Sequence, residues 1–387
     1  MARDFFQTFG KSDLAANPWI LTGHVLSAAA AKYGIASNEV FNSEIDIEEF
    51  HTAIESEFLK ALDRHRNDQD ERMNVIKLHA IYTQLILVFA ATINAIQNGP
   101  ISNPHLRLAQ TLEPGDSIIT FNWDTLMDRA LQHVSTWETD SGYGFSPHLI
   151  YREGWQLPSP QTSLTSPNLW KLHGSSNWLT SYPIVDYERF ELSLMQTSPV
   201  NRVYVFEAAR EPYPTWQGRF QSGFENFSYG YYPPNLPDDP GKSAGDGHLF
   251  ITAKHDFPWM PKGTAKKDGL LSSPLIIPPV KQKTYKLFGD LFDGLWRNAE
   301  DALARADKIA LIGYSFPRTD TQSIDLFRRA FCRRNAIPKL TIVDPMPDRA
   351  LEVIVHECGI PRSAVKVFRG NAGMFNDSFD VASLWEN

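Results

Sequence analysis

The sequence has few cysteines and no excess of positive charge. It has two cysteines, Cys332 and Cys358, in 387 residues. They are too few for a four-cysteine zinc site or for a disulfide-dense secreted domain. Lys and Arg total 37 against 45 Asp and Glu, which gives a net charge of -8. Because nucleic-acid binders carry basic surfaces, this balance argues against a strongly basic nucleic-acid binder.

The chain also lacks a long apolar run. Its most apolar window, residues 86–91, lies in a longer stretch that contains Lys77, His79 and Gln84. That stretch falls short of the ~20 apolar residues that span a bilayer, so we expect a buried core helix. The first residues contain no apolar segment of the secretory type, and we expect a cytoplasmic protein.

Hydrophobic periodicity divides the chain into helical, alternating and irregular parts. Residues 46–62 and 73–98 place apolar residues at helical spacing, and the second segment ends at Asn-Gly-Pro. Residues 147–283 hold 17 of the 26 prolines, which excludes long helices there. Short strands are predicted at 202–206 and 248–253. The expected parts are a mainly helical N-terminal part (1–112), a first core part (113–175), an irregular insertion (176–280) and a second core part (281–387).

Strands alternate with helices in the two core parts. A strand is predicted at 117–121, before a helix at about 124–133. The second core part reads as helix, strand, helix, strand, helix and strand, at 284–305, 308–313, 320–334, 339–343, 347–357 and 365–368. This order predicts an α/β fold, a parallel sheet with helices on both faces.

Ligands of open parallel sheets bind at the carboxyl ends of the strands, and two polar segments lie at such ends. Asn122 and Asp124 follow the first strand. Either can cap the next helix, or Asn122 can hydrogen-bond a sugar hydroxyl or a water. His173 follows a short apolar stretch and precedes Gly174 and Ser175. Since histidine can act as a general base near neutral pH, His173 is the best catalytic candidate.

A third polar segment follows the strand at 308–313. It contains Gly313, Tyr314 and Ser315. This turn precedes a helix capped by Thr319 or Asp320, and such a turn can cradle a phosphate. Asp344 follows the next strand, where a carboxylate can bind ribose hydroxyls or cap the helix that starts near Pro347.

Two other groups are weaker candidates. Four arginines on the helix at 320–334 are expected to form its solvated face, with a partner surface as the alternative: Arg328, Arg329, Arg333 and Arg334. The spacing of His248, His255 and Asp256 matches no strong metal-ligand pattern, so we expect no metal.

The order of these motifs resembles the SIR2-like (sirtuin-related) family, in its prokaryotic, defence-associated branch. The resemblance covers about residues 40–370 and implies a Rossmann-like core. The motifs are Ile119-Thr120-Phe121-Asn122-Trp123-Asp124, Lys171-Leu172-His173-Gly174-Ser175, Pro278-Pro279, Ile312-Gly313-Tyr314-Ser315 with Thr319-Asp320, and Val343-Asp344-Pro345.

The resemblance implies that Asn122 and His173 are the catalytic pair and that the bond between nicotinamide and ribose in NAD is broken. NAD would be the substrate. The residues implied to bind it are Thr120, Phe121, Asp124, Gly174, Ser175, Gly313, Tyr314, Ser315 and Asp344. No zinc is expected, because the chain cannot build a four-cysteine ribbon. That departure favours NAD hydrolysis, as in anti-phage members, over protein deacetylation.

A second departure concerns the glycine-rich phosphate loop with which the family usually opens. The early glycines, Gly10, Gly23, Gly34 and Gly99, form no G-x-G. Either the start has lost the first strand or this member has discarded it, and NAD binding is then expected to be weak or absent. Three hypotheses stay open: an NAD-hydrolysing anti-phage effector, a catalytically degenerate nucleotide-binding or assembly subunit, and a zinc-free protein deacylase.

The expected partners follow from the same resemblance. They are an NAD or ADP-ribose-like ligand, further copies of the chain, and a defence protein such as a HerA-type ATPase or an Argonaute-like protein. Neither a membrane nor direct nucleic-acid binding is expected. The catalytic pair requires that Asn122 and His173, which are distant in sequence, lie near each other in the folded protein.

Overall fold

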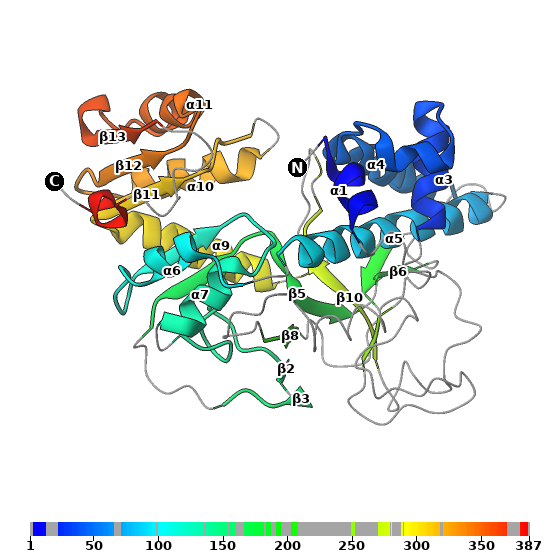
Figure 1. Ribbon diagram of the computed structural model, residues 1–387, viewed down its shortest axis with the longest axis horizontal. Helices are drawn as coiled ribbons and strands as arrows, with labels where there is room; N and C mark the ends of the chain where they lie inside the picture. The colour runs from blue at the N-terminus through cyan, green and yellow to red at the C-terminus, as the bar shows by residue number, and fades with distance from the viewer. Residues whose placement is uncertain are drawn as a thin grey trace.

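The computed structural model describes residues 3–12, 22–65, 71–97, 100–134, 137–152, 155–159, 166–181, 183–186, 191–194, 203–207, 249–251, 270–278, 280, 288, 290–317, 320–369 and 380–385. Within them the protein is a mixed α/β structure with parallel sheets and helices around them (Figure 1). The N-terminal helices lie at one end of the molecule, and the C-terminal strands and helices lie at the other (Figure 1).

The N-terminal part is helical, as predicted. Its elements are α1 (Phe5–Lys11), α3 (Gly23–Tyr33), η1 (Ser37–Asn42), α4 (Ile47–His65) and α5 (Arg72–Ile96). Their apolar side chains form one buried cluster, in which Phe5, Phe6, Phe9, Phe50 and Phe58 are the largest fully buried groups. The two helices predicted from periodicity, at 46–62 and 73–98, are confirmed as α4 and α5.

Helix α5 contains the most apolar window of the chain. Its residues 72–93 are long and apolar enough to cross a membrane, but 89% of the most apolar 18-residue window is buried inside the protein. The helix packs between α4 and strand β10 (Leu270–Ile276). Residues 86–91 are all buried there, as expected of a core helix.

The core parts contain two parallel sheets. In the first, β1 (Ser117–Thr120) pairs with β4 (Asn168–Lys171). In the second, β12 (Lys339–Val343) lies between β11 (Lys308–Ile312) and β13 (Val365–Phe368). The helices around them are α6 (Asn103–Ala109), α7 (Leu126–Val134), α9 (Asp290–Arg305), α10 (Thr321–Cys332) and α11 (Asp348–Glu352). The predicted alternation of strands and helices is thus confirmed, although the described residues form two parallel sheets rather than one.

Short helical turns complete the C-terminal part. The helix predicted at 347–357 is α11, which continues as a wider π-helical turn, Val353–Glu357. The other two turns are η5 (Arg362–Ala364) and η6 (Val381–Leu384).

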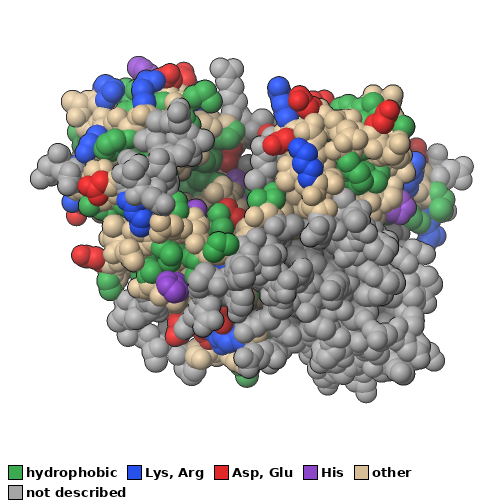
Figure 2. All heavy atoms as spheres, in the orientation of Figure 1, with side chains coloured by type: hydrophobic (Ala, Val, Ile, Leu, Met, Phe, Trp, Pro, Cys, Tyr) green, Lys and Arg blue, Asp and Glu red, His purple; other side chains and the backbone are tan. Residues whose placement is uncertain are grey.

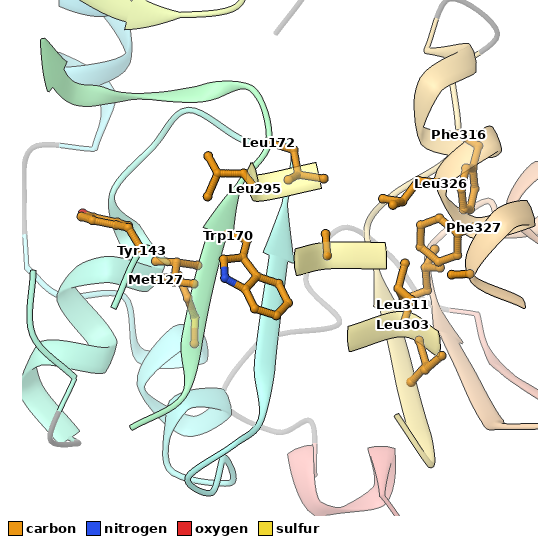
Figure 3. Close-up of a cluster of buried hydrophobic side chains, with 14 of the residues drawn as sticks. Met127, Tyr143, Trp170, Leu172, Leu295, Leu303, Leu311, Phe316, Leu326 and Phe327 are labelled. Atoms are coloured by element: carbon orange, nitrogen blue, oxygen red, sulfur yellow. The ribbon is translucent and has the colours of Figure 1, made fainter. Parts of the chain in front are cut away.

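Helix α9 joins the two parallel sheets through a shared apolar core. It contacts β1 and β4 on one side and α10 on the other. Leu295 lies near Trp170 and Leu172 of the first sheet, whereas Leu303 lies with Leu311 and the aromatic side chains next to β11 (Figure 3). This core holds the carboxyl ends of β1, β4 and β11 in fixed positions.

A mixed six-stranded sheet includes several described strands of the segment predicted as an irregular insertion and two strands that precede it. Its order is β3 (Trp155–Gln156), β2 (Leu149–Tyr151), β8 (Tyr204–Phe206), β5 (Gly174–Ser181), β10 and β9 (Leu249–Ile251). Strands β8 and β9 lie within the two short strands predicted there. A separate antiparallel pair consists of β6 (Pro183–Asp186) and β7 (Glu191–Leu194).

Strands β5 and β10 escaped prediction for identifiable reasons. The polar residues of β5 do not alternate with apolar ones, and Pro274 argues against a strand in β10. The structure accommodates that proline where the register of β10 against β5 shifts, between Pro274 and Ile276. Because β5 begins at Gly174, the domain boundary expected after residue 175 falls inside a strand.

Candidate functional site

The parallel pairing of β1 with β4 brings the Asn122 segment and His173 together. The ladder extends one step beyond the strands, where the Leu172 N–H donates to the Thr120 carbonyl at 2.9 Å. In the next step, Nδ1 of His173 lies 3.1 Å from the Phe121 carbonyl oxygen. Two motifs that are distant in sequence therefore meet at one edge of the sheet.

His173 is surrounded by aromatic rings and one carboxylate. The centroid of its ring lies 5.2 Å from that of Phe121 and 6.0 Å from that of Trp123. Its Nε2 lies 3.6 Å from Oδ2 of Asp320, and both side chains are only 3% exposed. The histidine is therefore a buried group with an acidic neighbour.

Tyr314 connects the second sheet to this histidine. Its ring stacks on Phe121, with 4.3 Å between centroids and 16° between planes. Its Oη lies 2.8 Å from Asp320 Oδ2 and 2.8 Å from Ser323 Oγ. The turn after β11 and the loop after β1 thus form one contiguous site.

The turn after β11 has an unusual backbone. Gly313 has φ +62° and donates its N–H to the Val343 carbonyl at 2.8 Å. Phe316 has φ +51°, a conformation that is uncommon for a residue with a side chain. Its buried ring packs against Tyr314 and Phe327, which holds the turn in place. Gly313 and Ser315 are left exposed at the carboxyl edge.

Asn122 lies at the surface, next in sequence to Phe121, whose carbonyl contacts the buried histidine. Its side chain is exposed, and its backbone N–H donates to Oγ1 of Thr120 at 3.0 Å. Trp123, the next residue, donates its indole N–H to the Ile277 carbonyl at 3.0 Å. The loop is therefore anchored on both sides of Asn122 while the amide faces outward.

Two of the acidic candidates accept from a backbone N–H two residues further along the chain. Oδ1 of Asp124 accepts from the Leu126 N–H at 3.0 Å, at the beginning of α7. Oδ1 of Asp344 accepts from the Met346 N–H at 2.7 Å, just before α11. The cap of α11 predicted for Asp344 is wrong, because Pro347 is the N-cap residue and its side chain makes no capping hydrogen bond.

Asp320 occupies the N-cap position of α10, but its side chain makes no capping hydrogen bond. The prediction that the Asp320 side chain caps this helix is therefore wrong. The other predicted cap, Thr319, lies outside the described residues.

Gly174 and Ser175 serve the sheet rather than an open ligand site. Gly174 has φ +79°, and a Cβ there would lie 2.1 Å from the Leu275 carbonyl oxygen. Only glycine lets β10 approach this closely. Ser175 is buried and donates from Oγ to Oδ1 of Asn177 at 2.6 Å. The sequence predicted that a ligand approaches Gly174 closely, but the backbone of β10 occupies that position.

A buried polar network beneath the loop was missed by sequence reasoning. Nζ of Lys171 lies 3.0 Å from Oδ2 of Asp128, and both side chains are 1% exposed. Lys171 also donates to the Asp124 carbonyl. Tyr143 donates to Oδ1 of Asp128 at 2.5 Å, and burial together with that carboxylate raises the pKa of Tyr143.

Gln97 supports the same loop from the end of α5. Its Oε1 accepts from the Thr125 N–H at 2.6 Å, and its Nε2 donates to Ser176 Oγ at 3.3 Å. A signal for the network existed in the sequence, since a lysine in the apolar run 169–172 needs a buried partner.

The arginines of α10 form ion pairs with the neighbouring elements. Arg329 and Arg333 both contact Glu300 of α9, at 2.8 and 3.0 Å. Arg328 lies 3.1 Å from Glu357, and Arg334 donates to the carbonyls at the end of α9. Acidic and basic side chains accordingly alternate over this end of the molecule (Figure 2). This arrangement is a solvated face with structural ion pairs.

In the part of the chain that the structure describes, no group of three His, Cys, Asp or Glu side chains could hold a metal ion. The candidates His248, His255 and Asp256 lie outside that part, as does Pro279. Chemically, the described site offers an exposed amide, a buried histidine paired with a carboxylate, and an exposed glycine turn. No protein-family model matches the chain, and no curated protein matches it.

Proposed function

We propose that the protein is a SIR2-like NAD⁺ hydrolase that cleaves the bond between nicotinamide and ribose. One observation carries the proposal: Asn122, His173 and the turn at Gly313 converge on one edge of parallel strands. Ligands of α/β sheets bind at this edge. A Rossmann-like arrangement of the core, and a role in anti-phage defence through NAD⁺ depletion, belong to the same proposal.

The residue types suit this reaction. The C1′–N bond breaks, and its electron pair leaves with nicotinamide. The oxygen of water bonds to the oxocarbenium-like C1′, and the proton that water loses passes to a base. The exposed Asn122 amide can hold the ribose or the water, and His173 can move the proton.

The turn after β11 fits the phosphates of NAD⁺. A Cβ placed on Gly313 would meet no atom within 4 Å, so the space beside the turn is open. Ser315 is exposed and offers a hydroxyl. Backbone N–H groups of such turns bind anions.

A second function is favoured by the burial of His173. Its side chain is 3% exposed, and its two ring nitrogens approach Phe121 and Asp320. A histidine held in this way can be purely structural, in which case the chain is a catalytically degenerate nucleotide-binding subunit. Such a subunit would bind ADP-ribose without consuming NAD⁺.

The test is nicotinamide release from NAD⁺ by the purified chain and three variants. We expect Asn122→Ala and His173→Ala each to lower the rate by about 100-fold or more, the scale of lost acid–base catalysis. His356→Ala, at an exposed histidine, is the matched control and should keep the full rate. Because Asn122 is exposed, its variant should fold even if His173→Ala does not.

Two results would contradict the proposal. One is an unchanged rate in both site variants, and the other is no release by the parent chain. Calorimetric titration with ADP-ribose then separates the alternatives, since a degenerate subunit still binds it.

A further inference from the structure

Two hydrogen-bond acceptors flank the ring of His173. Nδ1 lies 3.1 Å from the carbonyl oxygen of Phe121, and a carbonyl can only accept. Nδ1 therefore carries a proton. Nε2 lies 3.6 Å from Oδ2 of Asp320, which as a carboxylate also only accepts.

We infer that Asp320 is a positioning residue that holds His173 as the doubly protonated imidazolium. A neutral ring with its proton on Nδ1 would turn the Nε2 lone pair toward a carboxylate oxygen, which is repulsive. A proton on Nε2 makes the same contact attractive. Both side chains are 3% exposed, so little solvent screens either interaction.

The position of Asp320 supports this role over helix capping. It stands at the N-cap of α10, yet its side chain makes no capping bond. The carboxylate instead faces His173 and the hydroxyl of Tyr314, whose Oη lies 2.8 Å from Oδ2. That hydroxyl fixes the carboxylate on the side of the histidine.

The neighbours of the ring define its electrostatics. Among the described residues, Asp320 is the charged group that faces it, and Tyr314 is the titratable group that contacts Asp320. The rings packed around His173 are uncharged: Phe121, Trp123 and Trp296. Burial among such rings disfavours a charged histidine, so the carboxylate is what keeps the proton on Nε2.

The consequence for catalysis rests on the proposed NAD⁺ hydrolysis, whereas the charge of the ring does not. An imidazolium cannot accept a proton from water or from a ribose hydroxyl. The rate of nicotinamide release should therefore rise with pH as Nε2 loses its proton. Asp320 sets the pH at which that happens.

The primary test is ¹⁵N NMR of the full chain with labelled histidine, assigned by difference from His173→Gln. We expect both ring nitrogens of His173 to be protonated at pH 7. In Asp320→Asn the ring should become neutral, and its titration midpoint should fall by about one pH unit or more. Asp320→Glu should restore the parent midpoint. Asp325→Asn, at an exposed residue of α10 that pairs with Arg328, should change nothing.

A neutral His173 at pH 7 in the parent chain would overturn the inference, as would an unchanged midpoint in Asp320→Asn. If Asp320→Asn fails to fold, Tyr314→Phe keeps the carboxylate and removes only the hydroxyl. Its midpoint should stay well above that expected for a chain without the carboxylate, because the charge of Asp320 remains, and a neutral His173 at pH 7 in this variant would overturn the inference.

The pH dependence of nicotinamide release is the second readout. In Asp320→Asn the rising limb should move to lower pH by the same interval as the NMR midpoint. A shifted midpoint without any enzymatic activity would reject NAD⁺ hydrolysis and keep the charged pair. An unshifted midpoint in an active enzyme would reject the charged pair and keep NAD⁺ hydrolysis.

Discussion

The rings of Phe121 and Tyr314 stack face to face, with 4.3 Å between their centroids. Phe121 directly follows β1, and Tyr314 lies two residues beyond β11. The stack therefore joins the carboxyl ends of two sheets that share no strand pairing among the described residues. The stacked rings adjoin three parts of the candidate site: the loop with the exposed Asn122, the buried His173 and the Gly313 turn.

The stack and the hydroxyl of Tyr314 can be separated by substitution. Tyr314→Phe keeps the ring and removes the hydrogen bonds to Asp320 and Ser323, which should lower the unfolding free energy by about 1–3 kcal/mol. Tyr314→Leu also removes the aromatic pair, which should add about 0.5–1.5 kcal/mol. Urea unfolding measures both. Equal losses in the two variants would show that the stack contributes nothing to stability.

The buried pair of Lys171 and Asp128 should be far more sensitive than a surface pair. Asp128→Ala leaves a buried ammonium without its carboxylate, and we expect a loss of about 3–5 kcal/mol. Asp325→Ala breaks the pair with Arg328, where both side chains are about half exposed, and should lose less than about 1 kcal/mol. Denaturant midpoints compare the two variants, and similar losses would contradict the predicted role of burial.

Gly174 and Gly34 both have positive φ, but only Gly174 is closely approached. A Cβ at Gly34, the cap of α3, meets nothing within 4 Å, so Gly34→Ala should lose only about 1–2 kcal/mol from backbone strain. Gly174→Ala adds a clash with the Leu275 carbonyl and should lose at least twice as much. Thermal unfolding of both variants tests this. A milder effect at Gly174 would mean that β10 can move away.

The helical part should lose stability as its partly buried carboxyl, Glu55, ionises. Burial raises the pKa of Glu55, on α4, from 4.5 to about 7. Between these values the folded protein holds a proton that the unfolded chain has released, so the free energy of unfolding falls as pH rises. Glu55→Gln removes this contribution. The stability difference between variant and parent should therefore grow in favour of the variant from pH 4.5 to 7.

His51, one turn earlier on α4, should produce the opposite slope. Burial lowers its pKa from 6.5 to about 3, so the unfolded chain takes up a proton that the folded protein refuses. Its contribution to stability is therefore lost as pH falls from 6.5 toward 3. His51→Gln should flatten that loss in urea titrations at several pH values. A variant with the parent's slope would contradict burial as the cause.

Local patterns were sufficient for much of the fold. The helices α4 and α5 have apolar residues at helical spacing, and β1, β11 and β12 are short apolar runs bounded by turns. Because consecutive parallel strands end on the same side of a sheet, the same patterns placed Asn122, His173 and Gly313 at strand ends. Strands β5 and β10 could not be predicted, since their pairing depends on residues far away in the chain.

The roles of individual residues were decided by tertiary structure. Asp124, Asp320 and Asp344 look alike in sequence, each an aspartate between a strand and a helix. Asp124 and Asp344 bond to the N–H two residues on, as local geometry allows. Asp320 instead meets His173 and Tyr314, which other segments deliver.

The sequence by itself determined the helices α4 and α5, the strands β1, β11 and β12, and the chemical groups that follow those strands, because these depend on neighbouring residues. Only the tertiary structure decided that His173 is buried against a carboxylate, that Gly174 is needed by β10 and that Lys171 is paired with Asp128. Each of these contacts joins residues that are far apart in the sequence. Its energy depends on burial, which no local pattern encodes.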